Sequence, residues 1–193
     1  MSKFITLNIL EILELEEGLS YLKKMLSSFS CPLNDEIMHF ISKDAIEFAK
    51  KKIAITHLMV DAETFELLGF YTLTNKVIQI NADSFSKSMQ KKLKRYFTLD
   101  ENNNYIGPCY LIAQISKNYT NNLNYKITGN DILDDAFSTL SKAQKNVGGG
   151  FVYIECEDKD KIKKFYTDYG FSEIDERKSE EQITYKRMIR KLN

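Results

Sequence analysis

The chain has 193 residues, 43% of them hydrophobic, which is enough apolar material to bury a core. Its 27 basic and 27 acidic residues give a formal net charge of +0, which excludes a disordered polyelectrolyte and argues against nucleic-acid binding through bulk charge. Three widely spaced cysteines, Cys31, Cys109 and Cys156, indicate free thiols in a reducing compartment. An acidic N-terminal segment and short apolar runs predict a cytoplasmic protein without a membrane span.

The first half of the chain predicts both strands and helices. Alternating apolar and polar residues predict strands, and apolar residues at spacings of three and four predict amphipathic helices. Two neighbouring runs rich in β-branched residues predict an antiparallel pair. The expected elements are a strand over 4–9, helices over 19–29 and 37–49, strands over 53–60 and 67–80, and a helix over 83–97.

The second half has a clearer pattern. An apolar run of the kind found in buried central strands is followed by a polar, asparagine-rich loop, and glycines end both later helices. The expected elements are a strand over 110–115, a loop over 118–125, a helix over 130–146, a strand over 151–156, a helix over 158–170, an extended segment over 171–174 and a strand over 183–189. This order predicts an α/β arrangement on a mixed sheet.

The start of the helix near residue 130 has the features of an anion-binding site. Thr128, Gly129 and Asn130 mark this helix start, where the first backbone N–H groups lack intrahelical partners and the helix dipole is positive. Glycine permits close approach of a phosphate to the backbone. Glycines at helix starts are nevertheless common for structural reasons alone, so this feature is weak evidence by itself.

Segment 165–171, FYTDYGF, resembles the FYxxxGF helix of the GCN5-related N-acetyltransferases (GNATs). The segment 124–129 fits the phosphate-binding frame of that family, although Asn124 replaces the usual Gln or Arg and Ile127 replaces the first glycine. In the N-terminal half, ITHLMVD (55–61) and LGFYTL (68–73) resemble bacterial acetyltransferases related to the toxins of toxin–antitoxin pairs. The resemblance implies a mixed, mostly antiparallel sheet flanked by helices, in one acetyltransferase domain over 1–193.

The resemblance also implies that the two halves of the chain have different roles. Residues 1–105 would form the acceptor side and residues 106–193 the acetyl-CoA-binding core. A backbone N–H of the central strand, here that of Ile115, would polarise the thioester carbonyl, and Tyr166 would protonate the departing thiolate. The residues expected to contact acetyl-CoA are Ile115, Lys117, Ile127, Thr128, Gly129, Asn130, Asp131 and Phe165.

A general base is not fixed by the sequence. Glu155 and Glu157 share one face of a predicted strand, so either carboxylate is a candidate base, and both are equally well explained as solvent-exposed side chains at a strand end. Cys156 points to the opposite face and is expected in the core. His39 and His57 do not form a metal-ligand spacing with each other or with the cysteines, so no metal is expected.

Several alternatives stay open. The acceptor is a small amine, a protein amine or the α-amine of an aminoacyl-tRNA, and a toxin-type enzyme implies an antitoxin partner; a homodimer is also compatible. A non-catalytic protein of the same fold that binds a ligand or partner is the second hypothesis, because the phosphate-binding frame has lost residues. The basic residues of the 83–97 helix and of the C-terminal segment KRMIRKL suggest either a phosphate-binding patch or solvated faces.

Overall fold

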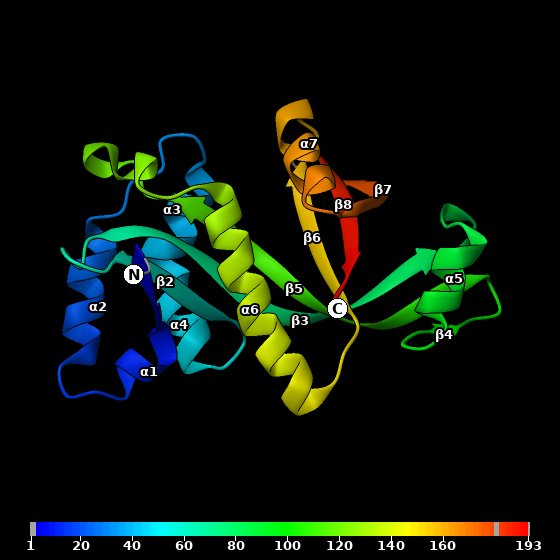
Figure 1. The fold of residues 1–193 in the computed structure, drawn as a ribbon, viewed down its shortest axis with the longest axis horizontal. Coiled ribbons are helices and arrows are strands. Elements are labelled where there is room, and N and C mark those ends of the chain that lie inside the picture. The colour runs from blue at the N-terminus through cyan, green and yellow to red at the C-terminus, as the bar shows by residue number, and fades with distance from the viewer. Residues whose placement is uncertain (1–2, 180–181, 193) are drawn as a thin grey trace. The chain divides into compact units, whose positions relative to one another are not determined.

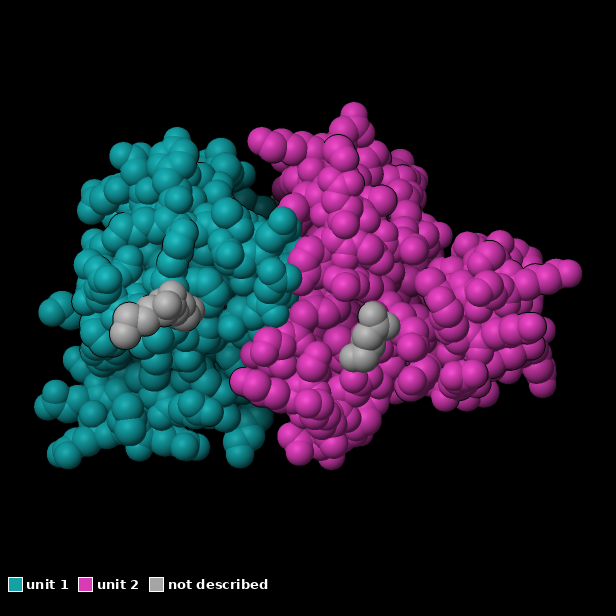
Figure 2. All heavy atoms as spheres, in the orientation of Figure 1, with its two compact units in different colours: residues 1–74, 112–136 teal, residues 75–111, 137–193 magenta. Residues whose placement is uncertain are grey.

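The computed structural model describes residues 3–179 and 182–192. The chain divides into two compact units, coloured separately in Figure 2: unit 1 comprises residues 1–74 and 112–136, and unit 2 comprises residues 75–111 and 137–193. Three elements, β3 (Leu67–Asn81), β5 (Asn104–Lys117) and α6 (Gly129–Val147), contribute residues to both units. The two units are therefore interleaved in sequence.

Unit 1 contains a helical layer packed on antiparallel strands. Its core is formed by apolar side chains of the N-terminal helices and the first strands, including Ile9, Leu22, Ile41, Leu58 and Phe70. Its further elements are β1 (Phe4–Asn8), α1 (Ile9–Leu13), α2 (Gly18–Ser27), α3 (Asp35–His39), a π-helical turn (Phe40–Asp44), α4 (Ala45–Lys50), β2 (Ile55–Asp61) and a 3-10 segment (Thr120–Tyr125).

Unit 2 has a separate core. Aromatic and aliphatic side chains from several strands and from the segment before β4 meet there, among them Phe97, Tyr105, Phe151, Tyr153 and Ile189. Its further elements are a 3-10 turn (Ala82–Ser84), α5 (Lys87–Leu93), β4 (Thr98–Leu99), β6 (Phe151–Glu157), α7 (Asp160–Asp168), β7 (Ser172–Lys178) and β8 (Thr184–Lys191). Figure 1 shows α5 and β4 on the segment that connects β3 with β5.

The strand order is β1-β2-β3-β5-β6-β8-β7, with β4 paired to β5. The β5–β6 pairing is parallel and covers two residue pairs, Tyr110↔Val152 and Leu111↔Tyr153. The pairings β1–β2, β2–β3, β4–β5, β6–β8 and β7–β8 are antiparallel. The predicted mixed, mostly antiparallel sheet is therefore confirmed, as is the pairing predicted for the strands near 53–60 and 67–80.

Local capping explains where helices depart from the prediction. Ile9 was expected to end a strand, but it begins α1, because the side chain of Asn8, the last residue of β1, accepts a hydrogen bond from the Leu10 N–H (2.9 Å). The helix expected over 83–97 is shortened to α5, because Phe85 is extended and Ser86 caps the helix by accepting from the Met89 N–H (3.3 Å). Polar side chains at such positions compete with helix continuation.

Two further findings bear on function. Within the described ranges, no helix is long and apolar enough to cross a membrane. The same residues include no group of three or more His, Cys, Asp or Glu side chains arranged to hold a metal ion. All three cysteines are buried free thiols.

Candidate functional site

Tyr166 is held in place by the turn that ends α7. Gly170 has a φ of +90°, a conformation that glycine adopts without strain, and it reverses the chain so that the Phe171 N–H donates to the Tyr166 carbonyl (3.0 Å). The Phe171 ring then packs edge-on against the Tyr166 ring, at 5.7 Å between centroids, and Phe165 packs on it at 5.1 Å. The FYTDYGF segment thus fixes one phenol in position.

The Tyr166 hydroxyl is available for chemistry. Its side chain is only 7% exposed, and burial, with a smaller contribution from Cys156, raises the pKa of this phenol above its ordinary value. No residue that the structure describes forms a hydrogen bond with the Tyr166 hydroxyl. A protonated, unpaired phenol is suited to donate a proton.

Glu155 and Glu157 are in different situations. Glu155 accepts hydrogen bonds from Lys76 Nζ (2.7 Å), from the Tyr153 hydroxyl (2.7 Å) and from Arg177. Burial acts to raise the pKa of Glu155, but these donors outweigh burial and hold the pKa below its ordinary value. Glu157 forms an ion pair with the exposed Lys159. The Glu155 carboxylate is therefore engaged by three donors, whereas Glu157 has one lysine partner among the described residues.

The loop between β5 and α6 is anchored by Asn118, a fully buried polar residue. Its Oδ1 accepts from the N–H groups of Ser30 (3.0 Å) and Thr120 (3.1 Å), and its Nδ2 donates to the Leu67 carbonyl (2.7 Å). Its backbone N–H donates to the Leu68 carbonyl at 2.7 Å. Asn118 therefore joins the end of β5 to the start of β3 and to the segment after α2.

The start of α6 differs from the predicted phosphate cradle in one respect. The Asp131 carboxylate accepts hydrogen bonds from the Thr128 N–H (2.7 Å) and the Thr128 hydroxyl (2.6 Å), and the Asp131 N–H donates back to that hydroxyl (3.1 Å). This is a capping box in which an anion already lies at the helix N-terminus. Within the part of the chain that the structure describes, the N–H groups of Ile127, Gly129 and Asn130 have no partner.

Lys117 and Ile115, which the sequence predicted as contacts of acetyl-CoA, lie at the end of β5, just before the loop that leads to α6. Lys117 Nζ donates to the Asn124 carbonyl (3.1 Å), so its ammonium braces the loop. Ile115 is a half-buried residue of β5. Gly69 allows β3 and β5 to approach closely, because a Cβ there would lie 2.7 Å from the Ser116 carbonyl oxygen. This packing accounts for the glycine in LGFYTL.

A second polar cluster in unit 1 was not expected from the sequence. The Asp135 carboxylate of α6 accepts from the Tyr71 hydroxyl (2.8 Å) and from the Thr6 hydroxyl (2.8 Å). The His57 ring stacks on Tyr71, with 4.9 Å between centroids. Burial lowers the pKa of His57 to about 4, against the opposing charge of Asp135. His57 is therefore neutral at physiological pH, and no periodic sequence signal would have linked these four positions.

Comparisons with known proteins identify solved structures that have the same fold as this chain. No protein-family model and no curated protein sequence matches the chain. A structure of AtaT complexed with acetyl-methionyl-tRNAfMet is 16% identical, covering 95% of this chain and 93% of its own, with a TM-score of 0.63. A mutant of KacT is 17% identical, covering 96% of this chain and 95% of its own, with a TM-score of 0.64.

A third structure, of a mutant AtaT toxin bound to the C-terminus of the antitoxin AtaR and acetyl-CoA, is 14% identical and covers 99% of this chain and 94% of its own, with a TM-score of 0.62. At these identities the likeness establishes the fold. It confirms the α/β architecture that the resemblance to toxin-type GNAT acetyltransferases predicted.

Proposed function

We propose that this chain is an acetyl-CoA-dependent N-acetyltransferase that transfers an acetyl group directly to an amine. The observation that carries the proposal is the fold likeness to AtaT over almost the whole chain, since one of those structures contains acetyl-CoA. The placement of Tyr166 as a buried, protonated phenol on the FYTDYGF helix supports it independently.

The residues at the start of α6 suit the pyrophosphate of acetyl-CoA in part. The N–H groups of Ile127, Gly129 and Asn130 are unpartnered donors within the described chain, and the helix dipole adds positive potential at that end. The Asp131 carboxylate lies at the same helix end, so its negative charge repels the pyrophosphate. We therefore assign phosphate binding to these three N–H groups and expect the affinity to be reduced by Asp131.

The chain's own residues would perform the following chemistry. Acetyl-CoA supplies the acetyl group as a thioester; a nitrogen–carbon bond forms as the carbon–sulfur bond breaks. The Ile115 N–H is assigned to the carbonyl oxygen, where negative charge develops. Tyr166, a phenol that is protonated at neutral pH, donates its proton to the departing sulfur. We assign Lys117 and Phe165 to holding the cofactor.

The acceptor amine must also lose a proton. We assign this step to Glu157, directly or through water, in preference to Glu155. Glu155 is neutralised by Lys76 and Arg177, whereas Glu157 has one exposed lysine partner. Removing the Glu155 carboxylate would also remove the hydrogen-bond acceptor of the Tyr153 hydroxyl. We therefore expect the loss of Glu155 to lower the stability of unit 2 as well as any activity.

The AtaT structures also support a narrower acceptor. One is complexed with acetyl-methionyl-tRNAfMet, so the α-amine of an aminoacyl-tRNA is the acceptor that we propose to test first, ahead of small amines and protein amines. Another contains the antitoxin AtaR, which supports a small protein inhibitor as a partner of this chain.

A non-catalytic binding protein is the competing function, and one observation favours it. The Asp131–Thr128 capping box satisfies part of the helix end that an active enzyme would use for phosphate. A protein that has lost cofactor binding would tolerate such a cap without cost. Transfer of the acetyl group, measured directly, separates the two functions.

The test is transfer of radiolabelled acetyl from acetyl-CoA to aminoacyl-tRNA, to free amines and to protein amines. We expect transfer by the wild-type chain and a loss of roughly a hundred- to ten-thousandfold in rate for Tyr166→Phe, as for removal of a general acid. Tyr169→Phe is the matched control on the same segment, because it removes a hydroxyl but keeps the ring that packs on Phe137. Equal rates for wild type and Tyr166→Phe would remove Tyr166 from the proposed role.

A further inference from the structure

Two basic segments that are distant in sequence meet at one pocket of unit 2. The segment from Ser84 to Leu99 carries Lys87, Lys91, Lys92, Lys94 and Arg95 and no acidic residue, in a chain whose net charge is +0. A pocket of about 200 Å³ is lined by Lys91, Lys92, Arg95, Tyr96 and Lys191. Lys191 comes from the end of β8, so the pocket combines cations of α5 and its following turn with a cation of another strand.

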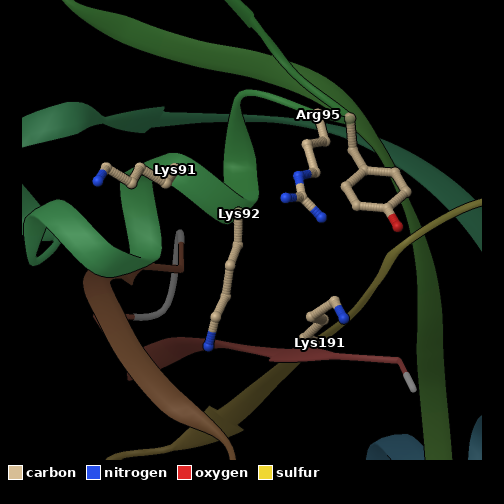
Figure 3. A pocket seen from close by; sticks show the side chains of 5 residues that line it. Lys91, Lys92, Arg95 and Lys191 are labelled. Atoms are coloured by element: carbon tan, nitrogen blue, oxygen red, sulfur yellow. The ribbon is translucent and has the colours of Figure 1, made fainter.

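The close view shows how these cations are disposed. In Figure 3, Lys92 and Arg95 extend from α5 and the turn after it into the same opening, and Lys191 borders it from β8, while Lys91 points away from the other three. Lys92 and Arg95 are exposed, and Lys191 is half-buried. None of these side chains forms an ion pair with any residue that the structure describes.

Lys191 differs in this respect from the other basic residues of β8. The neighbouring basic residues of β8 are engaged: Lys186 pairs with Glu173 (3.0 Å) and Glu176 (2.8 Å), Arg187 pairs with Asp175, and Arg190 lies over the Phe137 ring at 4.4 Å. Lysines at a helix C-terminus are favourable to the helix dipole, which explains Lys91 and Lys92 as structural residues. The dipole does not explain Lys191, which lies on a strand.

An aromatic ring completes the pocket. Tyr96 is 37% exposed and packs edge-on against Phe151, with 5.7 Å between ring centroids. Gly150 is required for this placement, because a Cβ there would lie 2.5 Å from the Tyr96 ring. The ring is thus fixed by packing, and one part of it remains accessible beside the cations. An exposed aromatic ring among basic side chains is a surface on which a nucleobase stacks while its phosphates are neutralised.

We infer that this pocket binds the phosphate backbone of a nucleic acid. Three cations around one opening match closely spaced phosphates, and the further basic residues of the Ser84–Leu99 segment, Lys87, Lys91 and Lys94, extend the positive surface beyond what a single phosphate needs. The chain's zero net charge means that such binding would depend on this local cluster. The inference uses none of the residues assigned to acetyl transfer, but it rests on the proposed function in one respect, because an aminoacyl-tRNA is the acceptor proposed there.

The experiment measures binding of a fluorescein-labelled RNA hairpin to the full chain. The test variant is Lys92→Gln/Arg95→Gln/Lys191→Gln. The control is Lys142→Gln/Lys145→Gln/Lys178→Gln, which removes the same charge from exposed positions outside the pocket and outside the Ser84–Leu99 segment. We expect the Kd to rise roughly ten- to a hundredfold for the test variant and less than about threefold for the control. The slope of log K against log salt should fall by about two to three for the test variant.

The inference would be overturned if the wild-type chain did not bind RNA, or if both variants weakened RNA binding equally. It would also be overturned if polyglutamate at equal charge concentration displaced the RNA, or if the chain bound pyrophosphate but not RNA. Thermal unfolding checks that both variants are folded; if the triple variant is not, Lys92→Gln alone, at an exposed position, tests the salt slope. Acetyl-CoA titration of the same samples is the independent measurement: lost RNA binding with retained acetyl-CoA binding leaves the proposed function intact.

Discussion

At the scale of single residues, Asp131 sets the charge at the start of α6. Its carboxylate accepts two hydrogen bonds from Thr128 and lies at the end of the helix that we assign to the pyrophosphate of acetyl-CoA. Asp131→Asn removes the negative charge and keeps a polar cap. We expect the Kd for acetyl-CoA to fall about three- to tenfold, since one nearby like charge contributes on the order of 1 kcal/mol near a protein surface.

Calorimetry of wild type, Asp131→Asn and the remote Asp160→Asn would measure this effect. Asp160 lies in the first turn of α7 and is fully exposed, so its variant changes the net charge equally. Because Asp131→Asn weakens the capping box, we expect it to lower the free energy of unfolding by about 0.5–1 kcal/mol, which denaturant unfolding measures. Unchanged or weaker acetyl-CoA binding by Asp131→Asn would contradict the assignment of phosphate to this helix end.

His57 gives unit 1 a pH dependence. Burial lowers its pKa in the folded chain to about 4 from an ordinary 6.5, so the stabilisation is complete above the unfolded-state pKa and is lost as pH falls toward the folded-state pKa. Asp135 is the charged group near the ring and acts in the opposite direction. Between about pH 7 and about pH 5, we expect the free energy of unfolding to fall by about 2 kcal/mol.

The measurement is denaturant unfolding at a series of pH values. His57→Gln should flatten the decline in that range, whereas His39→Gln, which changes the exposed histidine, should leave it in place. A decline of the same size in His57→Gln would show that other groups cause it.

Residue-level prediction succeeded where a local motif exists. Phe165, Tyr166, Gly170 and Phe171 lie within one seven-residue segment at the end of α7, so a sequence motif can represent them. The polar cluster of Thr6, His57, Tyr71 and Asp135 comes from four elements, and only the folded backbone brings them together. The assignment of catalytic roles to Tyr166 and Glu157 stays a prediction.

At the scale of elements, Asn118 determines how the end of β5 is attached. It is 0% exposed, and its side chain hydrogen-bonds to Ser30, Leu67 and Thr120. Asn118→Ala leaves two part-buried N–H groups and the Leu67 carbonyl without these partners, so we expect a loss of about 2–4 kcal/mol in the free energy of unfolding. Denaturant unfolding measures it, with the exposed Asn102→Ala as control; losses under about 1 kcal/mol would contradict the proposed clamp.

The strands and the long helix were predictable because burial imposes a period on the sequence. In α6 the buried residues Ile132, Leu133, Ala136 and Leu140 recur at helical spacing. The short helix α1 and the 3-10 segment at Thr120–Tyr125 were not predicted, since both depend on capping or on left-handed residues. Asn121 and Asn122 have φ values of 48° and 61°, which asparagine tolerates and which composition does not reveal.

At the scale of the whole molecule, the two compact units are not two consecutive stretches of the sequence. The predicted halves, 1–105 and 106–193, do not coincide with the two compact units, because β3, β5 and α6 each contribute to both. Long-range pairing decides this grouping, and no local pattern encodes it. The same holds for the basic residues. The sequence left a phosphate-binding patch and a solvated face open for the 83–97 segment and for the C-terminal strand, and only the fold brings Arg95 and Lys191 to one pocket.

The central claim is that the chain uses acetyl-CoA, and isothermal titration calorimetry of the full chain with acetyl-CoA tests it most directly. We predict saturable binding with one site per chain and a Kd in the micromolar range, weaker for CoA variants that lack the pyrophosphate. No detectable binding at high micromolar acetyl-CoA, by a chain shown to be folded, would contradict the proposed enzyme and leave a non-catalytic protein of the same fold.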